Sequence, residues 1–354
     1  MQTSDVESPI EAVGTIDVMF NPMSPVTWGI VHFDLNVSVY KNVVDALIAL
    51  KRSFRDSRRA QPHEESGGFS SLFFRGQPDV SFRLLPTRLR GNGPRALLGP
   101  KYAPSIAPDT PPDVRAEIKR MQGTWSRKEE GMRSMENLVE YLSAEVVGER
   151  DKKEKVAIAA AKERFKEVAD WDTFRLQAAV RHYTRVPSPL LDVSEDPEVA
   201  AFMATLGYQD DGEERYGMLW AVDIGRLKGL FAHEVVKVPG GEKIILTDQR
   251  QLWGDNQRFL DEQNLPPVRI EIVNVELPLP RPTAQKGRFL SIQGAAGQPI
   301  PMEAELVWWS MIERWSYGVA FIQTGVVYEN LQTGVTKAQL LPDNDPYLAL
   351  ESSA

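Results

Sequence analysis

An arginine stands at the end of an apolar strand in the segment SSLFFRGQPD, residues 70–79. Period-two geometry places Arg75 on the same strand face as Phe73, beside apolar neighbours. A buried guanidinium without an opposite charge is costly, so Arg75 must meet a protein carboxylate or an anionic ligand, and arginine can grip either in a bidentate manner. Gly76 allows a sharp turn or the close approach of a bound group. A structural ion pair and a ligand contact remain equally good interpretations.

A second polar segment, RHYTRVPSPLLDVSEDPEVAAFMAT, covers residues 181–205. Its prolines favour an extended chain, and Asp192 follows an apolar pair. We expect Ser194 to cap a helix that begins around Pro197, because Ser and Asp favour such positions. On this reading Asp192 and Ser194 are turn and cap residues, and His182 is a hydrogen-bonded helix residue. The alternative is that these side chains line a binding pocket.

A third segment, RPTAQKGRFLSIQG, covers residues 281–294 and leads into a strand. Gln285, Gly287 and Phe289 occupy alternate positions in it. Gln285 can present its amide to a ligand here, while a solvent-facing loop glutamine is the simpler interpretation.

The amino-acid composition limits the kinds of site and ligand that the chain can have. The chain of 354 residues has 42% hydrophobic and 25% charged residues, which is typical of a globular protein. It has no cysteine, and its four histidines lack the spacing of a metal site, so we expect no metal. The net charge of −8 argues against bulk binding of nucleic acid. Five arginines against one acid over residues 75–95 suit a small phosphorylated ligand instead. Without a signal-like start or a long apolar window, we expect a cytoplasmic protein that does not enter membranes.

Hydrophobic periodicity predicts the elements that must position these residues. The phase of the apolar residues changes near Val273, which predicts a β-bulge there. A region rich in Gly and Pro, residues 91–112, predicts a long irregular connection. Strands are predicted at 31–39, 69–74, 217–224, 268–278, 287–292 and 318–328, and helices at 40–55, 197–205 and 303–315.

The order of elements predicts an α+β fold. We expect a mixed, largely antiparallel β-sheet core, with a helical insertion at about 113–183 between two strand-rich halves. A weakly patterned N-terminal segment (1–25) precedes a single domain (26–345), and a tail (346–354) follows it.

Together, the three polar segments resemble the FRG domain family, named for its Phe-Arg-Gly motif, which is residues 74–76 here. The resemblance extends through FRGQPD, LLPTRLR, DWDTFRLQAAVRHY, PSPLLDVSEDPEVAAFMA and GMLWAVD, and through the spacing of Arg281, Gln285, Gly287 and Phe289. It covers roughly residues 40–340. His182 lies one residue out of the family's usual register.

The order of these motifs is similar to that of ADP-ribosyltransferases. This similarity implies that Arg75 holds the pyrophosphate of NAD, that Asp192 or Ser194 lines the nicotinamide pocket, and that Gln285 takes the position of a late glutamate. A glutamine can hydrogen-bond a ribose hydroxyl but supplies no negative charge. The predicted catalytic residues are Gln285, Asp192 and Ser194, and the predicted cofactor-binding residues are Arg75, Gly76, Gln77, His182 and Tyr183.

Two functions follow from this interpretation. In the first, the protein binds a nucleotide-type anionic ligand such as NAD and either hydrolyses its ADP-ribosyl group or transfers it to an acceptor such as a protein. A toxin or antiphage role is compatible with such a protein. In the second, Arg75 forms a structural ion pair with Asp192 in a non-catalytic module for protein interaction or regulation. An open pocket beside Arg75 favours the first, and closure by protein groups favours the second.

Overall fold

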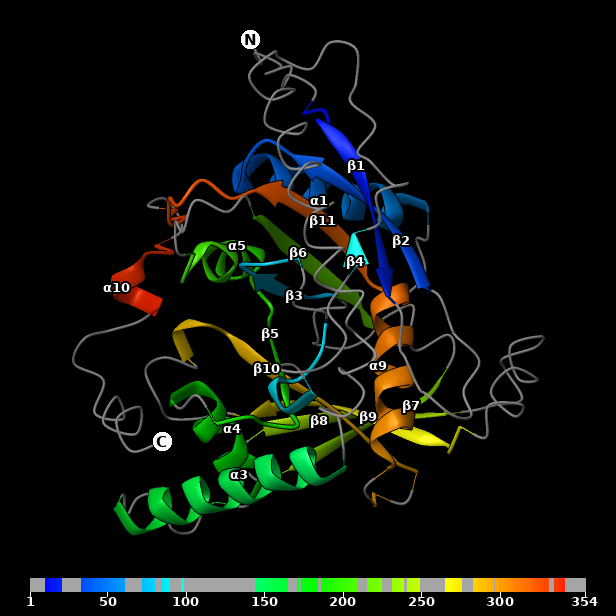
Figure 1. The fold of residues 1–354 in the computed structure, drawn as a ribbon, viewed down its shortest axis with the longest axis vertical. Helices are drawn as coiled ribbons and strands as arrows, with labels where there is room; N and C mark the ends of the chain where they lie inside the picture. The colour runs from blue at the N-terminus through cyan, green and yellow to red at the C-terminus, as the bar shows by residue number, and fades with distance from the viewer. Residues whose placement is uncertain are drawn as a thin grey trace.

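A computed structural model gives the arrangement of the chain (Figure 1). It describes residues 10–20, 33–60, 72–80, 84–89, 97–98, 144–164, 171, 173–183, 186–208, 215–224, 231–238, 241–248, 265–275, 283–295, 297–298, 300–330 and 334–340.

Eleven strands form one sheet in the described residues, in the order β4-β1-β2-β11-β6-β3-β5-β10-β9-β8-β7. Every described pairing is antiparallel except that of β2 with β11, which is parallel. The fold is therefore α+β with a mixed, largely antiparallel sheet, as predicted. The strands are β1 (Gly14–Phe20), β2 (Phe33–Tyr40), β3 (Leu72–Gln77), β4 (Leu97–Leu98), β5 (Leu191–Ser194), β6 (Tyr216–Asp223), β7 (Phe231–Val238), β8 (Gly241–Asp248), β9 (Val268–Val275), β10 (Gly287–Gly294) and β11 (Tyr317–Ile322).

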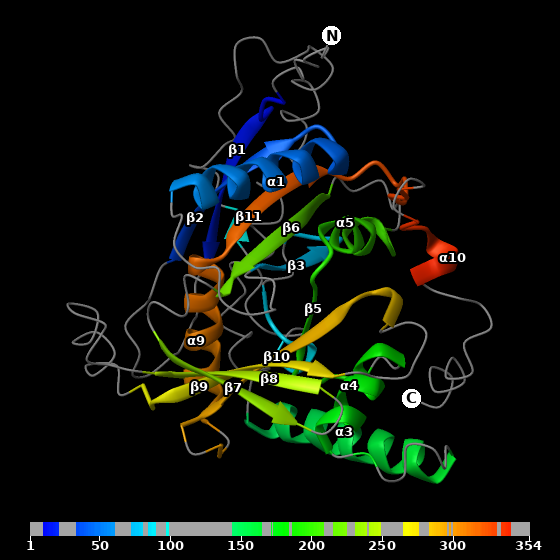
Figure 2. The same ribbon diagram turned by 180° about the vertical axis from the view of Figure 1, so that it is seen from behind.

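Helices cover both faces of the sheet. Figure 2 shows α1 and α5 over the half of the sheet that contains β11, β6 and β3, while α3 and α4 lie together beside the other half. The helix α9 lies on the opposite side of the sheet from α1 (Figures 1 and 2). The helices are α1 (Val43–Ala60), η1 (Thr87–Leu89, a 3-10 helix), α3 (Ala144–Arg164), α4 (Thr173–Tyr183), α5 (Pro197–Thr205), α9 (Met302–Trp315) and α10 (Lys337–Leu340).

The sheet is narrowest where β3 meets β5. The strands β3 and β6 pair over six residues, and β5 and β10 pair over four, but β3 and β5 share only the pair Phe74 with Ser194. The strand β5 ends at this pair, so the two neighbouring strands meet at one position only. This junction joins the two halves of the sheet.

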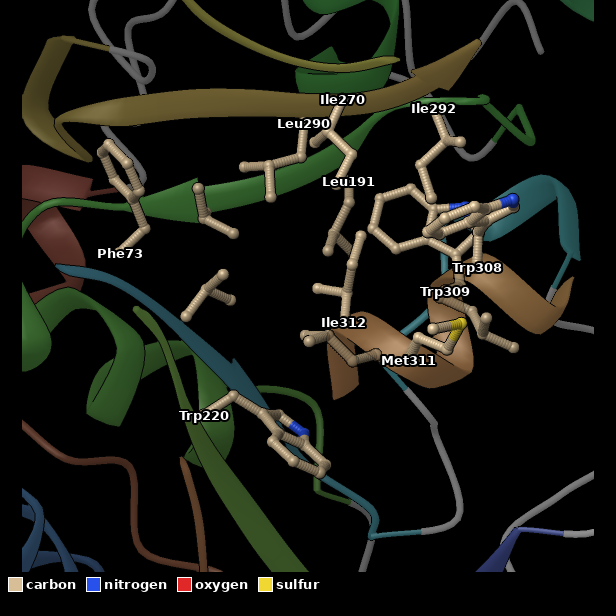
Figure 3. Packing of buried hydrophobic residues seen from close by; sticks show 14 of the residues in the cluster. Phe73, Leu191, Trp220, Ile270, Leu290, Ile292, Trp308, Trp309, Met311 and Ile312 are labelled. Atoms are coloured by element: carbon tan, nitrogen blue, oxygen red, sulfur yellow. The ribbon is translucent and has the colours of Figure 1, made fainter. Parts of the chain in front are cut away.

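One buried cluster spans the junction. Phe73 and Trp220 come from one half of the sheet and Leu191 and Ile270 from the other, and Figure 3 shows them on the same side as α9. The side chain of Trp308 on α9 is fully buried among them. Burial of large apolar side chains is the main stabilising term here, at about 25 cal/mol per Å². The cluster therefore holds the two halves together on this face.

Several predictions from periodicity are confirmed, with end residues that shift by a few positions. The helix predicted at 40–55 is α1, the helix predicted at 303–315 is α9, and the strand predicted at 217–224 is β6. Residues 113–143, 165–170 and 172 of the predicted insertion lie outside the described residues, and α3 and α4 account for the described remainder apart from Trp171. None of the helices in the described ranges is long and apolar enough to span a membrane.

The bulge predicted near Val273 is wrong. Pairing of β9 with β8 runs without interruption through this position to Val275, and pairing with β10 is regular up to Val273, where it ends. The apolar phase changes because both faces of β9 are covered: Ile270 and Ile272 lie in the central cluster, whereas Val273 packs with Phe289 and Leu176 in a separate cluster beneath α4. A strand that is buried on both faces does not show a simple alternation of apolar and polar residues.

Candidate functional site

A pocket of about 240 Å³ lies at the junction of β3 and β5. Its lining comes from β3, β5, the helix α5 and the start of β10. The lining includes Arg75, Asp192, Ser194 and Gln285. The structure therefore brings together residues from all three predicted segments. Apolar side chains, including that of Met203, form the rest of the wall.

Arg75 links β3 to β5. Its Nη1 donates to the main-chain carbonyl of Asp192 and to the carboxylate, with 2.6 Å between Nη1 and Oδ1. The Arg75 side chain is 7% exposed, whereas that of Asp192 is 32% exposed. The arginine is thus matched by a protein carboxylate and also lines an open pocket, so each of the two predicted functions finds a supporting feature.

The hydroxyl of Ser194 fixes the pocket wall. Its Oγ donates to the main-chain carbonyl of Gln285 at 2.8 Å and accepts from the main-chain N–H of Asp196 at 2.9 Å. This hydroxyl therefore ties the end of β5 to the turn before β10 and to the start of α5. Asp192 and Ser194 were candidates for turn and cap residues, but both lie in the strand β5.

The cap of α5 is Asp196, and the prediction that Ser194 caps this helix is wrong. The Asp196 side chain accepts from the main-chain N–H of Glu198 at 3.0 Å, and Pro197 opens the helix. Proline is well suited to the first helical position because its missing N–H would lack a helical partner there. The sequence Asp-Pro carried this signal, since it matches the preferred cap and first position.

Gln285 is buried rather than exposed, contrary to the simpler interpretation. Its side chain is 6% exposed, and its Nε2 donates to the main-chain carbonyl of Leu340 on α10 at 3.3 Å. The next residue, Lys286, has a φ of 47°, which is the left-handed region that side chains other than glycine rarely adopt. Its Nζ lies 2.9 Å from the carboxylate of Asp196. The turn that presents Gln285 is therefore held from both sides.

Gly76 permits a close approach, but the group that approaches is helix α5. A methyl group at this position would overlap the main-chain carbonyl of Ala200. The neighbouring Gln77 is 1% exposed and accepts from Trp220 Nε1 at 2.9 Å, so it faces the central cluster and is not part of the pocket lining. His182 and Tyr183 end α4, and their side chains lie outside the described part of the chain.

A second polar network anchors α5 next to the pocket. The side chain of Glu198 accepts from Lys51 at 2.5 Å, from Asn330 at 2.5 Å and from the hydroxyl of Tyr328. Burial acts to raise the pKa of Glu198, but these hydrogen bonds outweigh it and hold the pKa below its usual value. Burial and the bond to Glu198 raise the pKa of Tyr328. Sequence reasoning missed this network, because its partners come from distant segments.

No protein-family model, curated protein or solved structure matches the chain. In the described ranges, no group of three His, Asp or Glu side chains is placed to hold a metal ion.

Proposed function

We propose that the pocket binds a nucleotide-type anionic ligand such as NAD. One observation carries this proposal. Arg75 and Asp192 are 117 residues apart, and Ser194 and Gln285 are 91 apart, yet all four line one pocket. A concave site with a few convergent polar groups and otherwise apolar walls is the usual form of a small-molecule site. The resemblance to the FRG domain family and to ADP-ribosyltransferases supplies the ligand class.

The reaction that we propose is transfer or hydrolysis of the ADP-ribosyl group. The bond from C1′ of the ribose to the nicotinamide nitrogen breaks, and its electron pair leaves with nicotinamide. Water or a protein nucleophile then bonds to C1′ and loses a proton. Positive charge develops on the sugar, and Asp192 is the carboxylate in the pocket lining that can stabilise it. Gln285, being neutral, can orient a ribose hydroxyl.

The alternative is a non-catalytic module in which Arg75 serves the fold alone. The ion pair with Asp192 favours it, since Nη1 already donates to two oxygens of that residue. A salt bridge of this kind fixes the position of two strands that share one residue pair. In this case the protein binds no nucleotide, and its surface serves protein recognition or regulation.

Ligand binding separates the two functions. Thermal shift and calorimetry with NAD, ADP-ribose and ATP, together with chromatography for released nicotinamide, give the readouts. We expect NAD to bind the natural protein, and Arg75→Ala to lose binding while it remains folded. Arg288→Ala is the matched control, because it removes another paired arginine, 2.7 Å from Glu195, that does not line the pocket. Binding of none of the three ligands would favour the non-catalytic module.

A further inference from the structure

The charged group that a ligand reaches in this pocket is a carboxylate. Arg75 and Asp192 are the two charged residues in its lining. The Arg75 side chain is 7% exposed and its Nη1 bonds to Asp192, whereas the Asp192 side chain keeps 32% of its surface exposed. A phosphate placed against Asp192 would meet a like charge, which is unfavourable at short range. The pocket itself therefore suits a group that donates hydrogen bonds.

On the basis of the proposed function, we infer that the pocket takes a ribose of the nucleotide, with its 2′,3′-diol donating to the Asp192 carboxylate that Arg75 holds in place. An ionised carboxylate only accepts hydrogen bonds, and two adjacent hydroxyls can donate to it together. An acidic side chain that accepts from a ribose 2′-hydroxyl is a common device in dinucleotide sites. Arg75 is then a positioning residue, and the phosphates lie outside the pocket.

The size and walls of the pocket agree with a sugar. Its volume of about 240 Å³ is below the roughly 300–1,000 Å³ of sites for drug-sized ligands. The pocket is therefore too small to enclose a whole dinucleotide, and we assign it to one ribose of the ligand. Phe74, Val199 and Met203 supply apolar surface for the carbon face of such a group. Gln285 and Ser194, which are held by hydrogen bonds, complete the polar side.

The test compares ribose with deoxyribose on the unaltered protein. Calorimetry measures the affinity for NAD, for NAD that lacks the 2′-hydroxyl of the nicotinamide ribose, and for NAD that lacks the 2′-hydroxyl of the adenine ribose. We expect one of the two analogues to bind about tenfold more weakly or worse, because a hydrogen bond to a charged group is lost. Equal affinities for all three ligands would overturn the ribose assignment and leave the proposed function intact. Failure of all three to bind would overturn both.

Two variants test whether the preference for ribose over deoxyribose depends on Asp192. Asp192→Asn keeps the shape of the side chain and removes its charge, and we expect the ratio of NAD affinity to deoxy-NAD affinity to fall to about one. Asp45→Asn is the control, since it makes the same change on α1 and this residue is not in the pocket lining. It should keep the full ratio. A ratio unchanged in Asp192→Asn would contradict the assignment, and thermal unfolding checks that both variants are folded. If Asp192→Asn does not fold, the comparison of ligands on the natural protein decides the assignment alone.

Discussion

The Arg75–Asp192 pair is the residue-scale feature on which the site depends. The sequence alone predicted that the guanidinium would need an opposite charge, and the structure supplies one from a strand that lies next to it in the sheet. The pair is more than a surface contact, because the arginine is almost fully buried. Both groups that accept from Arg75, a main-chain carbonyl and a carboxylate, belong to Asp192.

A double-mutant cycle measures this pair. Arg75→Ala and Asp192→Ala should each destabilise the protein, by about 1–3 kcal/mol, because removing one partner leaves a charge without its match. The double variant should lose less than the sum of the two, by about 1 kcal/mol or more. Denaturant unfolding gives the free energies. Strict additivity would mean that the two side chains do not interact.

Lys286 is a second residue-scale feature, because its backbone is left-handed. Both Lys286→Ala and Lys286→Gly lose the contact of Nζ with Asp196, so their difference reports the backbone alone. We expect Lys286→Gly to be more stable by about 0.5–1 kcal/mol, since glycine adopts this φ without strain. Chemical denaturation of the two variants provides the comparison. Equal stabilities would argue that the turn relaxes to an ordinary φ.

At the scale of elements, buried carboxylates attach helices to neighbouring segments of the chain, with opposite pH dependence. On α5, hydrogen bonds to Glu198 lower its pKa despite burial. On α3, burial raises the pKa of Glu154, while its Oε2 accepts from Gln177 of α4 at 3.1 Å. The first carboxylate stabilises the fold when charged, and the second stabilises it better when protonated.

The lowered pKa of Glu198 predicts a loss of stability in acid. Its contribution is fully present above the usual glutamate pKa, here 4.5, and disappears as the pH falls through the lower folded value. Glu198→Gln should therefore lower the melting temperature at pH 7 and have little effect below the folded pKa. A melting temperature equal to that of the natural protein at pH 7 would contradict this account.

The raised pKa of Glu154 predicts that its effect on stability changes with pH in the opposite direction to that of Glu198. At pH 7 the folded state carries the cost of a buried charge, which vanishes below pH 4.5, where the folded and the unfolded states are both protonated. Glu154→Gln should raise the melting temperature at pH 7, and the gain should shrink as the pH falls. Glu163→Gln is the control, because this residue is exposed on the same helix. A gain that does not depend on pH would contradict the role of charge.

At the scale of the whole molecule, the two halves of the sheet depend on each other. They share one residue pair between β3 and β5, and the central cluster with α9 crosses that junction. We expect the described fold to unfold in one transition for this reason. The pocket lies at this same junction, where α5 and the start of β10 approach each other across β5.

Ile312 tests this dependence. Its fully buried side chain lies in the central cluster on α9, so Ile312→Ala should cost about 2–5 kcal/mol. Val156→Ala, at a position that is 69% exposed on α3, should change stability by about 0.5 kcal/mol or less. Tryptophan fluorescence and far-ultraviolet circular dichroism should give the same midpoint for Ile312→Ala. Two separate midpoints would mean that the halves unfold independently.

Periodicity predicted β3, β10 and α5, which carry part of the site, but neither the strand β5 nor the pairing of the strands. The strands β6, β9 and β10 and the helix α5 have clear apolar patterns, so their existence was predictable. The strands β1, β4, β5, β7 and β8 were not predicted. Strand order and the single pair at the junction depend on contacts across more than a hundred residues, which local patterns do not encode. For the same reason, Arg75 was predictable as a residue in need of a partner, while its choice of Asp192 remained open.

The most direct test of the central claim is a calorimetric titration of the natural protein with NAD beside a variant whose pocket is filled. Met203→Trp fills the wall of the pocket from α5 and leaves Arg75 and Asp192 in place, and Val156→Trp controls for an added indole on an exposed helix. The account predicts saturable binding to the natural protein and to Val156→Trp, and loss of binding in folded Met203→Trp. Equal binding by all three proteins would show that NAD does not occupy this pocket, and no binding by any of them would contradict the proposed function.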